Sequence, residues 1–499
     1  MMKKIFLMFV AAFPLLGAPV IAEILGRPTD RSVTVNVRAD AALEMYFESG
    51  VSRGVYTWQT KPVAASANQP VEVLIDGLNP NTRYYYRMRY RTVGTSGTVD
   101  AGTEHTFHTQ RLAGSTFVFA AQGDSHPERT NNMFNGELYS QTLRAVAAEQ
   151  PDFYLTSGDD FSVDLLTTFS AATVAQRYTL QLSYFGLMAH SSPLFLVNGN
   201  HEQMAGYLLD GTSNNVAVWA ANTRNLYYSQ PSPDGFYTGN SEPAPNVGLL
   251  RNYYSWEWGD ALFVTIDPYW PSPVAAANLL GSDAGGTNNR WLVTHGDAQY
   301  KWLKNTLESS KAKWKFVFAH HVLGTGRGGV EVASLYEWGG NNANGTSGFA
   351  ANRPTWATPI HQVMKANNVT IFFQGHDHLY ARQQLDGVVY QSLPNPADFM
   401  YVTGNADAYL SGDRFPNSGF VKVTVSPTAV KVDYIRQFLA KDVPVQFDNT
   451  AECCGWRSTS DGDSRRPVYP IGSPADDSTL NRRTKIVHLR GEVQICKNE

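Results

Sequence analysis

The stretch that decides the fold runs from residue 369 to residue 378 and reads VTIFFQGHDH. Residues 369–373 form a compact apolar run, which predicts a buried parallel strand. The turn Gly375-His376-Asp377-His378 follows it and carries two imidazoles separated by one residue. Glycine lets the backbone bend sharply, so both imidazoles can face a metal site. The alternative is a surface turn with two incidental histidines, and the other strand ends decide between the two.

The length and composition are those of a large globular protein. The chain has 499 residues, of which 43% are hydrophobic and 12% aromatic. These values allow two or three domains with a large core and exclude a disordered chain. The formal net charge of −4 gives no basic surface, so nucleic-acid binding has no electrostatic signature. A phosphate-binding site would therefore need a concentrated local charge such as metal ions.

The N-terminus has the pattern of a secretory signal peptide over residues 1–22. Lys3 and Lys4 precede an apolar run over residues 5–21, and residues 20–22 offer a cleavage point. A membrane anchor is the alternative, but two prolines and a glycine shorten the apolar run. No later stretch reaches ~18 uninterrupted apolar residues. We therefore expect a secreted or periplasmic protein with no membrane span in the mature chain.

Residues 23–111 predict a β-sandwich. Segments 32–37, 43–47, 71–75, 84–90 and 105–109 read as short strands between Gly, Pro and Asn turns. Strands at this spacing are typical of a sandwich of about 90 residues. Residues 76–86 (DGLNPNTRYYY) resemble the turn and tyrosine-bearing strand of fibronectin type III modules. We expect a packing or positioning role, since a fold alone confers no activity.

From residue 112 to residue 437, apolar runs alternate with helical segments, which predicts an α/β domain with a largely buried sheet. The expected strands cover residues 116–121, 153–156, 194–197, 253–258, 261–266, 314–319, 369–373, 388–393, 421–425 and 430–435. The expected helices cover residues 137–149, 174–188, 297–308 and 358–366. Segments 203–251, 267–290 and 324–353 do not fit and read as long loops that carry substrate contacts, cover a site or decorate the surface.

Residues 438–499 are expected to be a C-terminal extension packed on the α/β domain. The three cysteines of the chain, Cys453, Cys454 and Cys496, all lie in this extension. In an exported protein we expect one structural disulfide that joins Cys496 to Cys453 or Cys454.

Short polar motifs follow five of the predicted strands. They are Gly123-Asp124-Ser125-His126, Gly158-Asp159-Asp160, Gly199-Asn200-His201-Glu202, His320-His321 and Gly375-His376-Asp377-His378. In a wound α/β sheet the carboxyl ends of the strands lie on one edge, where ligands bind. Asp, Asn and His suit hard or borderline metal ions, and motifs without thiolates exclude a zinc finger or an iron–sulfur cluster. The simplest interpretation is two metal ions that share one carboxylate.

In this order, the five motifs resemble those of the calcineurin-like metallophosphoesterases over about residues 116–435. Residues 25–29 (LGRPT), which open the sandwich, and residues 299–303 (QYKWL) look most like the purple acid phosphatase branch. The resemblance implies an α/β/β/α layered domain with two packed sheets flanked by helices. It also implies two divalent or trivalent metal ions, with Fe, Zn and Mn as the candidates.

The resemblance implies a role for each motif residue. The first metal ion would be bound by Asp124, His126, Asp159 and His378. The second would be bound by Asp159, Asn200, His320 and His376, so that Asp159 bridges the two. His320 is preferred to His321 because it comes first after the strand. His201 would lie near the leaving group rather than on a metal.

One position departs from the purple acid phosphatase pattern. The branch has a tyrosine three residues after the bridging aspartate, and here that position is Ser162. His126 is present instead, as in the non-purple members of the superfamily. We therefore expect no tyrosinate charge-transfer band, and the resemblance does not establish the iron content.

The expected function is a secreted phosphatase that hydrolyses phosphate monoesters with a metal-bound hydroxide as nucleophile. His201 would stabilise the transferring phosphoryl group or protonate the departing alkoxide. Asp377 and Glu202 are expected to orient imidazoles or to be plain solvated carboxylates, and His321 and Arg327 are candidate contacts to a small phosphorylated substrate. The alternatives are a phosphodiesterase or nucleotidase with the same site and, less favoured, a non-catalytic binding protein.

Overall fold

The structure is a computed structural model, and it describes residues 20–130, 132–276, 289–322 and 326–442 together with the backbone of residues 487–488 and 493–496. Most of the predicted signal peptide lies outside the described residues, and the first strand begins at Val20. The side chains of the three cysteines also lie outside them, so the predicted disulfide stays a prediction. Among the described residues, no helix is long and apolar enough to cross a membrane.

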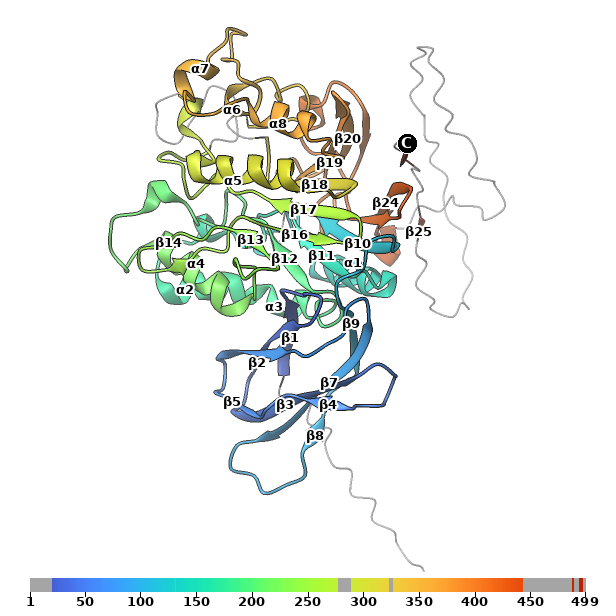
Figure 1. The fold of residues 1–499 in the computed structure, drawn as a ribbon. Coiled ribbons are helices and arrows are strands. Elements are labelled where there is room, and N and C mark those ends of the chain that lie inside the picture. Colours follow the sequence, from blue (N-terminus) through green and yellow to red (C-terminus); the bar gives the residue numbers. More distant parts are fainter. Residues whose placement is uncertain are drawn as a thin grey trace, which may run out of the picture.

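The N-terminal part consists of two antiparallel sheets, which form the lower lobe in Figure 1. One sheet contains β1 (Val20–Gly26), β2 (Val33–Ala39) and β6 (Pro70–Ile75). The other contains β3 (Leu43–Gly50), β4 (Trp58–Gln59), β5 (Val63–Ala65), β7 (Arg83–Thr92), β8 (Asp100–Ala101) and β9 (His105–His108). Along β7, Tyr84, Tyr86, Met88 and Tyr90 are buried and alternate with more exposed residues. Their packing against strands of the other sheet confirms the predicted sandwich.

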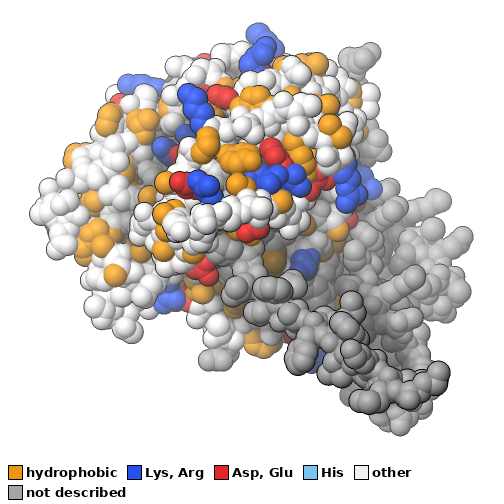
Figure 2. Space-filling view, turned by 90° about the horizontal axis from the view of Figure 1, so that it is seen from below, with side chains coloured by type: hydrophobic (Ala, Val, Ile, Leu, Met, Phe, Trp, Pro, Cys, Tyr) orange, Lys and Arg blue, Asp and Glu red, His pale blue; other side chains and the backbone are white. Residues whose placement is uncertain are grey.

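The outer side of the β3–β7 pair carries ion pairs rather than charge of one sign. Glu48 pairs with Arg87 and, at 3.5 Å, with Arg89, and Glu44 pairs with Arg91. Figure 2 shows acidic and basic side chains close together on the face of the molecule seen from below. On that face the charges are therefore largely matched locally.

The second domain contains two sheets. The first has the order β12 (Leu194–Leu196), β11 (Phe153–Thr156), β10 (Phe117–Gln122), β23 (Gly419–Val425), β24 (Ala429–Arg436), and β24 also pairs with β25 (Val487–His488) and β26 (Val493–Cys496). The second has the order β13 (Thr238–Gly239), β16 (Tyr254–Trp258), β17 (Ala261–Thr265), β18 (Trp314–Phe318), β19 (Ile371–Gln374), β21 (Val388–Ser392), β20 (Tyr380–Leu385), β22 (Asp413–Phe415). A separate hairpin joins β14 (Pro243–Ala244) and β15 (Gly248–Leu249). Strands β10, β11 and β12 are parallel, as are β17, β18, β19 and β21.

An aromatic core lies between the two sheets. The rings of Phe119 and Phe153 each form an edge-to-face pair with the ring of Phe263, with centroids 5.1 and 5.0 Å apart. Such edge-to-face pairs add to the free energy gained by burying the rings. Because helices cover the outer faces as well, the central strands are buried on both sides, which explains their continuous apolar sequence.

Helices cover the outer face of each sheet (Figure 1). On the first sheet lie α1 (Gly136–Glu149), α2 (Ala171–Leu180), α3 (Leu182–Phe185) and α4 (Val216–Tyr227). On the second lie α5 (Gly296–Ser309), α6 (Tyr336–Gly339) and α8 (Ile360–Ala366), with α7 (Phe349–Asn352) beside them. Short 3₁₀ turns occur at Val163–Leu165, Gly206–Leu208, Arg290–Leu292, Ala406–Ala408 and Ala440–Asp442. This arrangement confirms the predicted α/β/β/α layers.

Three details of the sequence prediction are wrong. The segments 203–251 and 324–353 are not continuous loops, because α4 lies within the first, and α6 and α7 lie within the second. The N-terminus of α4 is capped by Asn215, and its buried face mixes alanines with Thr223 and Arg224, which gives a weak hydrophobic pattern. The single helix expected at residues 174–188 is two helices, which meet at Gln181.

The sandwich contacts the second domain through a pair of stacked histidines. The ring of His105 in β9 stacks on that of His190, with centroids 4.0 Å apart and an interplanar angle of 27°. Tyr86 Oη donates a hydrogen bond of 2.7 Å to the carbonyl oxygen of His190, and the backbone amide of Thr106 donates to Ser191 Oγ. Burial, and after it the neighbouring His190, lowers the pKa of His105 from 6.5 to about 3.

Because of the lowered pKa of His105, we expect the free energy of unfolding to fall in acid. The unfolded chain binds a proton at His105 below about pH 6.5 and the folded chain does not, so the contribution of His105 is complete above pH 6.5 and is lost as the pH falls towards 3. The slope is at most about 1.4 kcal/mol per pH unit. Replacing His105 with glutamine should make the thermal midpoint fall less between pH 7 and pH 4.5 than it does in the wild type. Equal falls in the two proteins would contradict this prediction, because Glu104 and His190 remain in both.

Candidate metal centre

The loops that follow β10, β11, β12, β18 and β19 meet at one edge of the two sheets. Each loop delivers a polar side chain within a few residues of its strand end. The structure brings together all the residues predicted to bind metal: Asp124, His126, Asp159, Asn200, His320, His376 and His378. Among the described residues, side chains that can hold a metal ion form three overlapping groups in which the ligand atoms lie within 4.8 Å of one another: Asp124, His126 and His378; Asp159, His320 and His376; and His126, Asp159 and His201.

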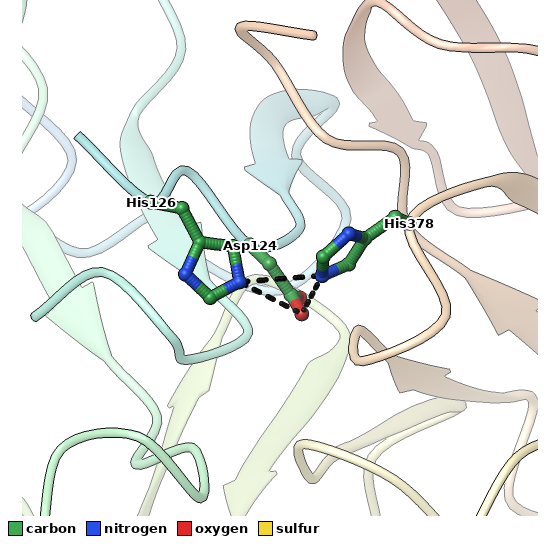
Figure 3. Close-up of side chains that lie close together, drawn as sticks. All are labelled: Asp124, His126 and His378. Atoms are coloured by element: carbon green, nitrogen blue, oxygen red, sulfur yellow. Dashed lines mark hydrogen bonds and ion pairs between the residues drawn. The ribbon is translucent and has the colours of Figure 1, made fainter. Parts of the chain in front are cut away.

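The first group contains Asp124, His126 and His378 (Figure 3). Nε2 of His378 lies 2.9 Å from Oδ2 of Asp124, and Nε2 of His126 lies 4.0 Å from the same oxygen. The two Nε2 atoms are 3.3 Å apart. All three ligand atoms therefore face one point, although they come from loops after different strands.

The second group is centred on His320. Its Nε2 lies 3.0 Å from Oδ2 of Asp159, 3.0 Å from Oδ1 of Asn200 and 3.1 Å from Nδ1 of His376. His320, Asp159 and His376 are almost completely buried. His376 thus points to this group, whereas His378 points to the first one.

Asp159 connects the two groups. Its Oδ2 lies 3.0 Å from Nε2 of His320 and 4.0 Å from Nε2 of His126. Its other oxygen, Oδ1, accepts a hydrogen bond of 2.9 Å from the backbone amide of His201. One carboxylate oxygen therefore faces both groups, in the place where a bridging ligand would be needed.

The backbone is strained at this site. His126, Asp159, His376 and His378 have φ angles of 47°, 57°, 68° and 53°, in the left-handed region that residues other than glycine seldom adopt. Such conformations persist only where the surroundings enforce them, and they cluster at functional sites. At Gly375, a Cβ atom would lie 2.4 Å from Oδ1 of Asp124, so this turn requires glycine.

The charges of the cluster favour a cation. Burial alone would raise the pKa of Asp124, but His378 and His320 outweigh it and lower the pKa to about 2. Burial would likewise raise the pKa of Asp159, yet His320 and His201 hold it well below its usual value. For His320, burial lowers the pKa, but the carboxylates of Asp159 and Asp124 raise it to about 10. Two buried carboxylates thus concentrate negative charge at this point.

Two neighbouring acids, Asp160 and Glu202, add little to that charge. Burial raises the pKa of Asp160 to about 7, although Ser125 donates a hydrogen bond that opposes the shift. Burial and the charges of Asp159 and Asp160 raise the pKa of Glu202 well above its usual value. Of these four acids, Asp124 and Asp159 are therefore the ones that stay ionised at neutral pH. Beside His126, Glu128 adds a further negative charge, because His126 outweighs burial and lowers the pKa of Glu128 to about 2.

Backbone and side-chain acceptors orient the imidazoles. Nδ1 of His320 lies 2.8 Å from the carbonyl oxygen of Ser157, and Nδ1 of His126 lies 3.0 Å from Oγ of Ser162 and 3.3 Å from Glu128. A partner on one ring nitrogen directs the other towards the cluster. Ser162, which replaces the tyrosine of the purple branch, therefore supports His126.

Asp377 and Glu202 do not have the predicted roles. Glu202 accepts hydrogen bonds from the backbone amides of Gly199, Asp160 and Phe161. The partners of Asp377 among the described residues are Arg327, the amide of Gly328 and the hydroxyl of Tyr409. Both carboxylates are buried, so neither the imidazole-orienting nor the solvated prediction holds. They fix the loops that present the ligands.

His201 lies beside the cluster and has two partners that the sequence did not reveal. Its Nδ1 lies 2.6 Å from Oδ2 of Asp164, and its Nε2 lies 3.2 Å from a terminal nitrogen of Arg129. Burial lowers the pKa of His201, but Asp159 and Asp164 raise it above its ordinary value. Arg129 lies in a loop and Asp164 in a short 3₁₀ turn, so no periodic signal could have linked them to His201.

The side chains of His321 and Arg327, the two predicted substrate contacts, already contact other residues of the protein. His321 is buried, with Nδ1 3.1 Å from Tyr269 Oη and its ring 4.6 Å from that of His376. Arg327 donates to the carbonyl oxygen of His376 and to Asp377. These contacts support the turn at His376, and a role in substrate binding stays a prediction for both residues.

The donor set fits metal ions. Oδ2 of Asp124 is completely buried and makes no hydrogen bond of acceptable geometry, although Nε2 of His378 is close. Oδ1 of the same carboxylate is occupied by the backbone amide of His376 at 2.8 Å. A buried, unpaired carboxylate oxygen is costly unless a cation satisfies it. Imidazole, carboxylate and amide donors suit Zn, Mn and Fe.

Two packed, helix-flanked sheets with a cluster of Asp, Asn and His at the strand ends define a metallophosphoesterase-type domain. The family model for calcineurin-like phosphoesterases matches residues 117–380, more than half of the chain, and the chain belongs to this family. The resemblance of the five motifs is thereby confirmed.

Relatives of known name agree with this assignment. An acid phosphatase from Aspergillus ficuum is 25% identical over 346 residues, which cover 53% of this chain. The match spans about half of that relative, 55% of its length. The structure of PhoD is similar with a TM-score of 0.58 at 16% identity, over 85% of this chain and 88% of that one. The purple acid phosphatase PPD1 from yellow lupin seeds has a TM-score of 0.54 at 15% identity, over 84% and 72% of the two chains. At these identities the two structures support the fold alone.

Proposed function

We propose that this protein is a secreted phosphatase that hydrolyses phosphate monoesters at a dinuclear metal centre, with a fibronectin type III-like sandwich in a supporting role. The observation that carries the proposal is the position of Asp159, whose Oδ2 faces both groups of ligand atoms. Membership of the phosphoesterase family and the similarity to an acid phosphatase support the chemistry. The signal-peptide pattern at residues 1–22 supports export.

In this proposal each group of side chains holds one metal ion. Asp124, His126 and His378 hold the first, Asn200, His320 and His376 hold the second, and Asp159 is shared. When bound, the ions would lower the pKa of coordinated water and neutralise charge on the phosphoryl oxygens. The chain contributes the positions of these ligands, which are fixed by Gly375 and by the acceptors on the remaining ring nitrogens.

His201 is proposed to act on the substrate rather than on a metal ion. Asp164 accepts a hydrogen bond from Nδ1, which leaves Nε2 facing the cluster, 3.8 Å from Oδ2 of Asp159. A proton held at Nε2 could pass to the departing alkoxide, and the imidazole could also donate to a phosphoryl oxygen. Asp159 and Asp164 raise the pKa of His201, which favours the protonated form that either role requires once Nε2 no longer accepts from Arg129.

A panel of esters tests the proposed function. With metal-reconstituted protein, we expect p-nitrophenyl phosphate to be hydrolysed with a higher kcat/KM than bis-p-nitrophenyl phosphate, because a monoester presents more negative charge to the cluster. Preferred turnover of the diester, or of AMP or ATP, would favour the phosphodiesterase or nucleotidase alternative. Protein that binds no metal and hydrolyses no ester after reconstitution with Fe, Mn or Zn would instead support a binding protein.

A further inference from the structure

The loop between His126 and α1 places Arg129 at the edge of the cluster. The backbone amide of Arg129 donates 3.0 Å to the carbonyl oxygen of His126, and the carbonyl oxygen of Arg129 accepts 3.2 Å from the amide of Phe134. The same turn therefore holds a predicted metal ligand and this arginine. The Arg129 side chain is 20% exposed, so it is largely buried but open to a ligand.

The terminal nitrogens of the Arg129 guanidinium, which are strong hydrogen-bond donors, have only weak acceptors. One terminal nitrogen lies 3.2 Å from Nε2 of His201 and the other 3.7 Å from the sulfur of Met133. Its Nε is buried without a hydrogen bond, although Glu128 lies 3.3 Å away. An imidazole nitrogen and a thioether sulfur are neutral acceptors, and a thioether is a poor one.

Two other arginines of the domain donate hydrogen bonds to carboxylates. Arg111 makes two hydrogen bonds to the carboxylate of Asp152, at 2.7 and 2.9 Å. Arg327 donates to Asp377. Arg129 differs from these residues, because only its Nε lies near a carboxylate, that of Glu128. Of its terminal nitrogens, one lies beside His201 at the cluster and the other beside Met133, and neither has an anionic acceptor among the described residues.

We propose that Arg129 is a substrate-binding residue that donates to the non-bridging oxygens of a phosphate monoester dianion held at the cluster. This inference rests on the proposed function and specifies its substrate class. The planar guanidinium matches the spacing of phosphoryl oxygens and can bind two of them. A monoester dianion carries one more unit of negative charge than a diester, so Arg129 favours monoesters.

Arg129 also connects substrate binding to His201. In the structure, the arginine donates to Nε2 of His201, the nitrogen that faces the cluster. When the guanidinium donates to a phosphoryl oxygen instead, Nε2 no longer accepts from it. His201 is then available to the leaving oxygen only when a phosphoryl group is present.

The test compares the variants Arg129→Gln and Arg129→Lys with the wild type. Arg144→Gln is the matched control, because Arg144 is exposed on α1. The binding of inorganic phosphate to each metal-loaded protein is measured by calorimetry, and kcat/KM is measured for p-nitrophenyl phosphate and its bis ester. For Arg129→Gln we expect phosphate binding and monoester kcat/KM to fall about tenfold to a hundredfold, and diester kcat/KM to fall by less than about threefold. For Arg129→Lys we expect values between those of the wild type and Arg129→Gln, because lysine keeps the positive charge but lacks the paired N–H groups of the guanidinium.

Unchanged phosphate affinity in Arg129→Gln would overturn the inference, and so would a wild type that binds no phosphate. A shift confined to the pH profile of kcat would assign Arg129 to positioning His201 only, which also overturns it. If the glutamine variant does not fold by circular dichroism, the lysine variant decides, and wild-type affinity in it would contradict a fork contact. A wild type that binds phosphate through Arg129 but hydrolyses no ester would refute the proposed function and leave this assignment intact.

Discussion

Replacing Asp159 with alanine is expected to remove both metal ions and to lower phosphatase activity by at least about a thousandfold. Asp159 is the carboxylate whose oxygen faces both His320 and His126. Without it, each group loses an anionic ligand, and only Asp124 is left to balance the charge of two cations. Metal content per chain by mass spectrometry and kcat for p-nitrophenyl phosphate measure the two effects.

The neighbouring Asp160 provides a matched control for this variant. It is equally buried and follows in the same turn, but its Oδ1 accepts hydrogen bonds from Ser125 and Gln122 and does not face the ligand groups. Asparagine at position 160 can accept the same hydrogen bonds, so Asp160→Asn should keep both metal ions. If Asp159→Ala folds and retains both ions, the bridging assignment is wrong.

The two histidines of the opening motif should have separable effects. His376→Ala is expected to deplete mainly the second metal ion, because His376 Nδ1 lies 3.1 Å from Nε2 of His320. His378→Ala is expected to deplete mainly the first, because His378 lies against Asp124. Each variant should retain about one ion per chain and lose about a hundredfold or more in kcat, since in-line displacement uses both ions.

Elemental analysis of the two single variants and of the double variant measures this separation. The double variant should retain neither ion. His361→Ala is the control, because His361 lies in α8 and contacts Tyr390 and Asp386 rather than the cluster. Full activity with both ions in either single variant would contradict the assignment of these histidines to different metals.

The clustering of the motifs could be predicted from the order of the strands, whereas the assignment of each ligand to a metal ion came from the resemblance to the family. Buried strands have a continuous apolar sequence, and parallel strands of one sheet end at one edge, so the residues after β10 and β11 in the first sheet, and those after β18 and β19 in the second, were expected to lie together. The motif Gly375-His376-Asp377-His378 also encodes its own bend, since no Cβ fits at Gly375 beside Asp124. For these residues, the position in the sequence therefore indicates the position in the structure.

The supporting residues could not be predicted in the same way. Glu202 and Asp377 were expected near imidazoles because they adjoin them in sequence. Left-handed backbone at Asp159 instead precedes an amide, that of Asp160, which donates to Glu202, and Asp377 accepts from the amide of Gly328 in a distant segment. Arg129 reaches His201 from a loop and Asp164 from a short 3₁₀ turn. Loop conformation depends on hydrogen bonds between distant segments, which no periodicity in one sequence records.

The central claim is that this cluster binds two metal ions through one shared carboxylate. The most direct test is a titration of metal-free wild-type protein with Mn²⁺, Zn²⁺ or Fe²⁺, followed by removal of unbound metal and measurement of metal per chain alongside phosphatase activity. We predict that bound metal reaches two ions per chain and that activity appears as the second ion binds. A stoichiometry of one or none for all three metals, or full activity in the metal-free protein, would contradict the account.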